Sequence, residues 1–304
     1  MSGYEKTISD INKKIEDGSV VVLGEAEFRD EISRSARINL SDIDVVTIAF
    51  HAAILGTAAM LCVPVTGPGV FTRARKIWLN GVPGHPGPAP NERLGLVDTL
   101  ILGDEKSTKG EKSYDGGKLI RDVIANKKVD VECLSVEGDT YRNTFTLDQL
   151  QFARMYVYNC YLDQLDGAHN LKRPERHFKM IKVGSKILLN RAPGIVIGCG
   201  TRSRPEKKTL SMAADMFEMD PEVIKELEGE EKGALANLVA LAIPVLSREV
   251  LDDLLDYFRQ DNFDKTMKKA TDDSENMAIY LKKLILDRKF FLIDSDMELK
   301  HWVQ

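Results

Sequence analysis

Residues 20–50 read VVVLGEAEFRDEISRSARINLSDIDVVTIAF, and this stretch carries the strongest indication of the fold class. An apolar run opens it, a helix is predicted over residues 25–37, and DVVTIAF at 44–50 reads as a buried strand. A strand, a helix and a strand at this spacing predict a parallel pair of strands. A helix is also expected over residues 4–16, and Gly18 is expected to end it.

The following segment, residues 56–90, contains six of the 11 prolines and six of the 22 glycines. Glycine permits a positive φ and a close backbone approach, whereas proline fixes φ and lacks a donor. We therefore predict a long ordered loop, interrupted by a short strand at 76–79, that forms one wall of a site. Cys62, Asn80 and His85 lie along it, and Asn80 is a candidate substrate-binding residue.

The remaining pattern predicts a mixture of strands and helices. Strands are expected at 97–102, 129–136, 141–146, 178–189 and 194–198, and helices at 115–126, 147–161, 221–228, 232–240, 247–258 and 262–289. The strands at 129–136 and 141–146 should form an antiparallel hairpin. The predicted fold class is α+β (mixed α/β), in which a mixed sheet body with ordered Gly/Pro-rich loops precedes a helical C-terminal tail. We predict two domains, 1–245 and 246–304.

Composition excludes several classes of protein. The formal net charge of −5 argues against nucleic-acid binding, and no apolar run reaches the roughly 18 residues of a membrane span. The polar N-terminal sequence does not resemble a signal peptide, so we expect a cytoplasmic protein. The four cysteines, at 62, 133, 160 and 199, lie too far apart in sequence for a local metal-binding clip, and we predict no metal site.

The stretch from Gly198 to Arg204, GCGTRSR, is the leading candidate for chemistry. A thiol, Cys199, lies between Gly198 and Gly200, whose backbone N–H groups can face a ligand. Arg202 and Arg204 can bind a carboxylate or phosphate and lower the pKa of the thiol. The alternative is a tight turn with a solvated basic rim.

Each of the other candidate functional residues also has a purely structural interpretation. Cys62 is either a second nucleophile or a buried core residue, and the latter interpretation is favoured for Cys133 and Cys160. His51, at the end of a predicted strand, or His85 is the expected proton carrier. The sequence Asp115-Gly116-Gly117 is either an anion-binding helix N-terminus or an N-cap with two permissive residues.

Several segments in order resemble the archaeal homocysteine-biosynthesis (sulfur-incorporation) family, in particular its branch called methanogenesis marker protein 16. They are KTISDINKKIEDGSVVVLGEAEF (6–28), DVVT (44–47), KIWLNGVPG (76–84), YDGGKLIRDVIANKKVDVE (114–132), TFTLDQL (144–150), KVGSKILLN (182–190), GIVIGCGT (194–201) and IPVLSREVL (243–251). The resemblance implies a cytoplasmic archaeal protein. It also implies that sulfur enters aspartate semialdehyde to give homocysteine through a cysteine persulfide, with electrons from an iron–sulfur partner.

This chain departs from the family pattern at two thiols. The relatives carry a cysteine shortly after DVVT, where this chain has HAAILGT at 51–57. Their persulfide-forming cysteine corresponds to Thr140, which cannot carry a persulfide. The cysteines that bind an iron–sulfur cluster in this branch, and a nucleotide-sensing module, are not matched either.

The hypothesis is therefore a sulfurtransferase-like enzyme that uses Cys199 or Cys62 to pass sulfur to a small anionic carbonyl substrate. Arg202 and Arg204 would hold the carboxylate, and His51 or His85 would carry the proton. No cofactor is expected within the chain, and a ferredoxin-like or iron–sulfur protein is the expected electron donor. A homo-oligomer is left open. The alternative is a non-catalytic binding or assembly factor associated with methanogenesis.

Overall fold

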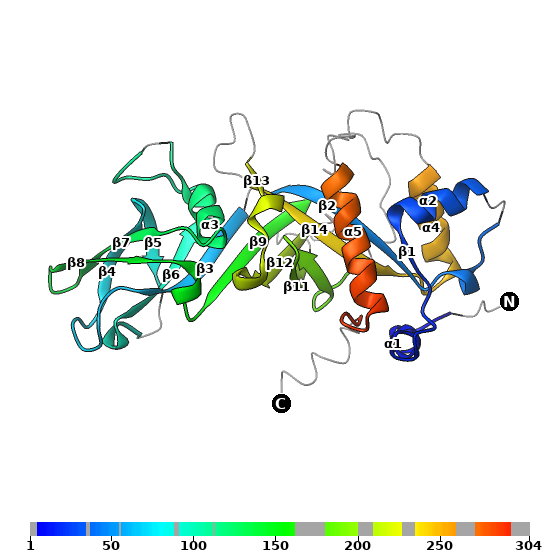
Figure 1. Ribbon diagram of the computed structural model, residues 1–304, viewed down its shortest axis with the longest axis horizontal. Helices are drawn as coiled ribbons and strands as arrows, with labels where there is room; N and C mark the ends of the chain where they lie inside the picture. Colours follow the sequence, from blue (N-terminus) through cyan, green and yellow to red (C-terminus); the bar gives the residue numbers. More distant parts are fainter. Residues whose placement is uncertain are drawn as a thin grey trace.

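The computed structural model describes residues 5–34, 37–54, 56–87, 91–111, 113–161, 180–199, 209–226, 235–259 and 271–292. Fourteen strands and five α-helices lie in these residues (Figure 1). The strands are β1 (Val22–Gly24), β2 (Val45–Ile54), β3 (Gly56–Pro64), β4 (Ala74–Leu79), β5 (Val82–Pro86), β6 (Leu96–Leu102), β7 (Val129–Ser135), β8 (Thr140–Phe145), β9 (Ala153–Tyr161), β10 (Lys186–Leu189), β11 (Ala192–Cys199), β12 (Thr209–Asp215), β13 (Lys225–Glu226) and β14 (Leu235–Pro244). The helices are α1 (Ile8–Asp17), α2 (Glu25–Arg34), α3 (Gly116–Ile124), α4 (Arg248–Arg259) and α5 (Thr271–Leu286). Among the residues described, no helix is both long and apolar enough to cross a membrane.

The N-terminal strand–helix–strand unit confirms the parallel pairing predicted from sequence. β1 and β2 are parallel, with Val22 opposite Val45, and α2 connects them. α1 ends at Gly18, whose φ of 81° lies in the left-handed region that glycine adopts at little cost. The α+β class is likewise confirmed, with a mixed sheet and helices at the C-terminal end.

The strand order closes a ring around one hydrophobic core. β2 pairs with β14, and the path continues through β10, β11, β12 and β9 to β3, which follows β2 directly in the chain. All pairings along this path are antiparallel. The inner faces bury apolar side chains, including Met155, Val157, Val196 and Met212, at essentially zero exposure.

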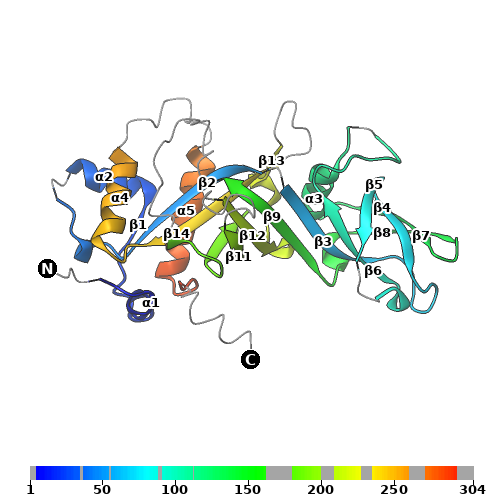
Figure 2. The ribbon, with the colours of Figure 1, turned by 180° about the vertical axis from the view of Figure 1, so that it is seen from behind.

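The helices α1 and α5 cover the outer face of the ring at β1, β2, β10 and β14 (Figures 1 and 2). Their apolar residues form a second buried cluster, in which Ile15 and Leu281 pack with Val45 and Leu238. The chain thus buries β14 on both faces, and every residue of LANLVALAIP is buried.

A second lobe lies at the other end of the long axis and contains β4 to β8 and α3 (Figures 1 and 2). β7 pairs with β4 and β8. β5 connects β4 to β6, because its residues 82–84 pair with β4 and its residues 85–86 pair with β6. The predicted hairpin at 129–136 and 141–146 is confirmed as β7 and β8.

Four sequence predictions of local structure are wrong. The helix expected at 221–228 is a 3-10 turn, Pro221–Val223, followed by β13. Most of residues 56–90 forms β3, β4 and β5 rather than a loop. Residues 147–161 are a short 3-10 turn followed by β9, because burial at Ala153, Met155 and Val157 repeats every two residues. Residues 235–244 are β14 rather than a helix, since a continuous apolar run does not distinguish a buried strand from a buried helix.

A buried polar network ties the strands of the ring together. Asn190 Nδ2 donates to Asn237 Oδ1 at 2.8 Å, and Asn237 Nδ2 donates to Thr57 Oγ1 at 3.3 Å. Asn190 Oδ1 accepts from the Leu238 N–H at 2.9 Å. Asn190 and Arg191 both have positive φ in the two-residue turn between β10 and β11, a conformation that asparagine tolerates well.

Asp44 anchors the N-terminal helix to the sheet. Its carboxylate is fully buried and accepts from Lys6 Nζ and Lys14 Nζ, each at 2.8 Å, and from the Val21 N–H at 2.9 Å. Although burial opposes ionisation, the hydrogen bonds from Lys14 and Lys6 hold the pKa of Asp44 below its ordinary value. Lys6 is itself buried, so the pair cannot be broken without leaving an uncompensated charge.

Replacing this carboxylate should destabilise the protein strongly. We expect Asp44→Asn to lower the free energy of unfolding at pH 7 by about 3–5 kcal/mol, measured by urea denaturation. Because the folded pKa is depressed, the wild-type advantage is present above the unfolded pKa of about 3.9 and disappears as the pH falls through the folded value. The exposed Asp30→Asn should cost less than about 0.5 kcal/mol, and an equal loss in both variants contradicts the account.

Removing the central amide of the polar network should also be costly. Asn190→Ala leaves the Leu238 N–H and the Asn237 amide without their partner in a dry core. We expect a loss of about 2–4 kcal/mol in unfolding free energy, from thermal or urea unfolding. Asn276→Ala on the exposed face of α5 is the control and should change stability by less than about 0.5 kcal/mol.

Candidate functional site

Cys199 is the exposed thiol among the free cysteines that the structure describes. It is the last residue of β11, opposite Leu210 of β12, and a register shift between Val196 and Gly198 precedes it. Residues opposite each other in an antiparallel pair share a face, so the bulge places Cys199 on the same face as the core residue Leu210. The thiol thus lies at the end of β11, on the core-facing side of the ring, where it is exposed. We call this position the rim of the ring.

Opposing effects act on the pKa of Cys199. Desolvation raises the pKa above that of an ordinary thiol, while the backbone N–H of Val183 donates toward the sulfur and opposes the rise. Gly198 forms part of the bulge before it. Gly200, Arg202 and Arg204 lie outside the described residues.

Cys62 has a very different environment. It is buried on β3 opposite Asp98 of β6, and its thiol forms a hydrogen bond with the Asp98 carboxylate. Burial, that hydrogen bond and the negative charge of Asp98 raise the pKa of Cys62 to about 12. Asp98 is held in turn by Asn91, whose Nδ2 donates to Oδ2 at 2.8 Å. This arrangement keeps the thiol protonated at neutral pH.

Cys133 is buried on β7, as the sequence indicated, and burial raises its pKa to about 11. Its environment lies in the second lobe, away from the ring. The backbone of Cys160 lies in β9, and its side chain is outside the described residues.

The two candidate nucleophiles do not meet. The Cys62 N–H donates to the Phe152 carbonyl, at the start of β9, whereas Leu210, the register partner of Cys199, pairs with Cys160 near the end of β9. Phe152 and Cys160 are eight residues apart along the strand, which corresponds to about 26 Å at about 3.3 Å per residue. Chemistry through a pair of thiols is therefore not built from Cys62 and Cys199.

The two candidate histidines also lie apart from Cys199. His51 is not at a strand end but within β2, opposite Leu238 of the outer cluster, so it belongs to the opposite face of the ring. Its Nε2 lies 3.2 Å from the Val223 carbonyl, and its buried Nδ1 has no partner among the described residues. Burial and the nearby Lys225 lower the pKa of His51, which favours a neutral ring.

His85 lies on β5 in the second lobe, and its exposed ring is 3.9 Å from Glu105. By register it shares a face of the sheet with Asp98 and Cys62. It is the histidine nearer to Cys62 in the strand order, and neither described histidine shares the face of Cys199.

The Asp115-Gly116-Gly117 sequence forms an N-cap, the alternative weighed from sequence. Asp115 Oδ1 accepts from the Lys118 N–H at 3.0 Å. The N–H groups of Gly116 and Gly117 donate to the carbonyls of Glu105 and Gly103, each at 2.8 Å. These donors are therefore not available to an anion. A Cβ at Gly116 would lie 1.9 Å from the Leu102 carbonyl oxygen, which explains the glycine.

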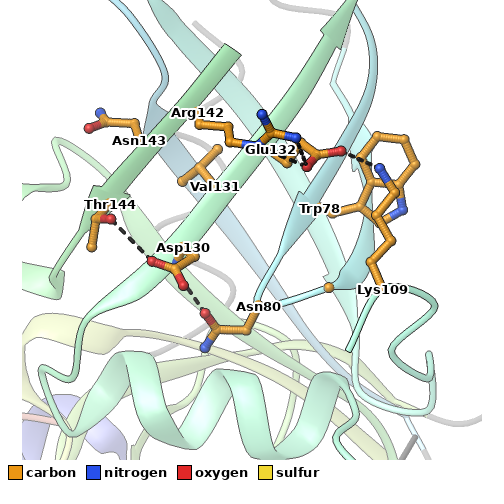
Figure 3. Close-up of a pocket in the computed structure, with 10 residues that line it drawn as sticks. Trp78, Asn80, Lys109, Asp130, Val131, Glu132, Arg142, Asn143 and Thr144 are labelled. Carbon is orange, nitrogen blue, oxygen red and sulfur yellow. Dashed lines mark hydrogen bonds and ion pairs between the residues drawn. The ribbon is translucent and has the colours of Figure 1, made fainter. Parts of the chain in front are cut away.

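Asn80 lines an open groove in the second lobe (Figure 3). It has φ 47° in the turn between β4 and β5, and its Oδ1 accepts from the Asp130 N–H at 2.8 Å. The groove, about 610 Å³, also contains Trp78, with Lys109 Nζ 3.4 Å from its ring centroid. Glu132 pairs with Lys109 and Arg142, and these ion pairs lower the pKa of Glu132.

The sequence did not reveal this groove, since its residues come from four separate segments. Only the Asn-Gly turn is a local signal. The polar groups of the groove largely satisfy one another, as the dashed contacts in Figure 3 show, so we regard it as a stabilising surface network. Across the described residues, no group of three His, Cys, Asp or Glu residues is arranged to hold a metal ion.

The contrast between the two thiols can be measured by alkylation. At pH 8 the Cys199 thiol should react with iodoacetamide much faster than Cys62, because the latter is buried and protonated. Asp98→Asn removes the negative charge beside Cys62, so its pKa should fall and its rate should rise about tenfold for each pKa unit. Asp104→Asn, at an exposed position, is the control. An unchanged Cys62 rate in Asp98→Asn would show that the carboxylate does not control the thiol.

Comparison with known proteins gives the family. The sequence profile of a family described as "Homocysteine biosynthesis enzyme, sulfur-incorporation" matches residues 20–173 and 172–262. An uncharacterized protein of Methanothermobacter thermautotrophicus is 32% identical over 282 residues, which cover 83% of this chain and 65% of the relative. No solved structure matches.

Two more distant relatives carry a functional name. Proteins named L-aspartate semialdehyde sulfurtransferase, from Methanosarcina acetivorans and Methanocaldococcus jannaschii, are each 24% identical, over 83% and 81% of this chain. The matches span 59% and 55% of those relatives, so the chain corresponds to little more than half of their length. The family predicted from sequence is confirmed, and the marker protein 16 branch stays a prediction.

Proposed function

This chain belongs to the homocysteine-biosynthesis, sulfur-incorporation family, and from that membership we propose that it incorporates sulfur into a small anionic carbonyl substrate through the thiol of Cys199. The observation that carries the proposal is the exposure of Cys199 at the rim of the ring. Desolvation also raises the pKa of Cys199, but Cys62 and Cys133 are buried thiols whose pKa values are raised to about 12 and 11. A thiolate is the form that attacks or carries sulfur.

The printed names of two relatives suggest the substrate. Aspartate semialdehyde, the substrate in those names, is a small molecule with a carboxylate and an aldehyde. We propose that Arg202 and Arg204 bind the carboxylate, since guanidinium groups match carboxylates in geometry and charge. Gly198 and Gly200 beside the thiol would allow the substrate to approach the backbone closely.

The reaction must balance in atoms and electrons. Sulfur replaces the aldehyde oxygen, which leaves as water, and two electrons and two protons convert the resulting thiocarbonyl to a thiol. If the sulfur arrives as the outer sulfur of a Cys199 persulfide, two further electrons break the S–S bond and restore the Cys199 thiolate. We assign these electrons to a separate ferredoxin-like or iron–sulfur protein in the cytoplasm.

The proposal is tested by homocysteine formation from aspartate semialdehyde with a persulfide donor, which supplies sulfane sulfur, and a chemical reductant. Cys199→Ser should reduce the rate by at least about 100-fold, because a hydroxyl cannot carry sulfane sulfur. Cys133→Ser in the second lobe is the matched control and should retain near-normal rates. Cys62→Ser should also retain activity. Equal activity of wild type and Cys199→Ser contradicts the proposal.

One observation favours the alternative, a non-catalytic binding or assembly factor associated with methanogenesis. Helix α5 exposes three large apolar side chains, Ile279, Tyr280 and Leu286, at 40–52% of their area. Exposed apolar patches mark surfaces that contact partners. If wild-type protein forms no homocysteine with any donor while Cys199 stays an unmodified thiol, the alternative becomes the better account.

A further inference from the structure

A groove lies between the C-terminal half of α5 and the outer faces of β11 and β12. We call it the α5 groove. It is lined by strand residues that include Ile195, by Tyr280 and Leu284 of α5, and by Lys289 just beyond the helix. Its volume is about 760 Å³, within the roughly 300–1,000 Å³ of sites that bind small molecules.

Positive charge is not balanced within the α5 groove. Four cationic side chains line it: Arg154, Lys186, Arg191 and Lys289. Arg191 pairs with Asp220 at 3.0 Å, whereas no ion pair within the described part of the chain involves the other three.

The carboxylates of the α5 groove are fewer than the three cations that form no ion pair with another described residue. Asp215, which accepts the Phe217 N–H at 3.0 Å, and Glu218 are the carboxylates that remain after the Arg191–Asp220 pair. Three cations therefore face two carboxylates, one of which already has a backbone partner. Lys186, Lys289 and Arg154 together can contact a ligand with more than one negative charge, and Glu218 can accept hydrogen bonds from the donor groups of that ligand.

The floor of the α5 groove is apolar and exposed. Ile195 of β11 and Tyr280 of α5 expose 39% and 40% of their area to solvent, and Leu284 lines the same groove. An aromatic side chain beside a branched aliphatic one provides a surface for a planar ring. A simple inorganic anion would leave this surface uncovered.

We propose that the α5 groove binds a small ligand that joins two or more negative charges to a planar ring, the chemistry of a nucleoside diphosphate. The phosphates contact Lys186, Lys289 and Arg154, the ring lies on Ile195 and Tyr280, and sugar hydroxyls donate toward Glu218. Ile195 precedes the bulge and lies on the outer face, whereas Cys199 lies on the core-facing side of the strand. The binding is therefore separate from the thiol site.

The test is isothermal titration calorimetry of the full chain with ADP, and with pyrophosphate as the anion that lacks a ring. We expect saturable ADP binding with a Kd below about 100 μM, and pyrophosphate weaker by at least about tenfold. Lys186→Gln/Lys289→Gln should weaken ADP binding at least about tenfold. The matched control Lys76→Gln/Lys128→Gln, which removes two exposed lysines of the second lobe, should bind ADP normally.

Tyr280→Ala separates the ring contact from the charge contact. It should weaken ADP binding about tenfold and leave pyrophosphate binding unchanged, and circular dichroism should confirm that each variant is folded. The proposal is overturned by absence of ADP binding at about 1 mM, by equal affinity for ADP and pyrophosphate, or by full affinity in the double lysine variant. Because these readouts do not involve sulfur transfer, their failure leaves the Cys199 proposal standing.

Discussion

The backbone hydrogen bonds along residues 45–64 hold the rest of the structure in place. β2 pairs with all ten residues of β14, and β3, the next strand in the chain, pairs with β9 and β6. One stretch of chain therefore closes the ring and extends into the second lobe. The other strands of the ring, β10, β11 and β12, complete the path between β14 and β9. Their register, and hence the position of Cys199, follows from these pairings.

Local signals predicted the elements whose side chains repeat with a clear period. The parallel β1–β2 pair, α1 with Gly18 at its end, and the β7–β8 hairpin all match the sequence pattern. β14 was mistaken for a helix because its residues are buried on both faces, so no period is visible. The glycines and prolines of 56–90 were assigned to a loop, yet Pro64, Pro83 and Pro86 are accommodated in β3 and β5.

The site was less predictable than the fold because its geometry depends on pairings between distant segments. Sequence analysis favoured Cys199 and kept Cys62 as a second candidate nucleophile. The carboxylate that holds the Cys62 proton is Asp98, 36 positions away, and nothing near Cys62 in the sequence indicates it. The bulge that turns Cys199 toward the core-facing side arises from pairing with β12. The glycines of Asp115-Gly116-Gly117 were recognised as permissive, and their donors are used by the backbone of residues 103–105.

The thiol environments divide the three described cysteine side chains into two classes. Cys62 and Cys133 are buried in the core, and burial keeps their thiols protonated. Cys199 lies at a strand end, where its sulfur is accessible to solvent and accepts from a backbone N–H group. The family relationship supplies the chemistry for which such a thiol is suited. The most direct test is mass spectrometry of protein purified without oxygen, after alkylation and digestion. The account predicts an added mass of about 32 Da, one sulfur atom, on the peptide of Cys199. Sulfur on Cys62 instead, or an unmodified Cys199 after incubation with a sulfur donor, would contradict it.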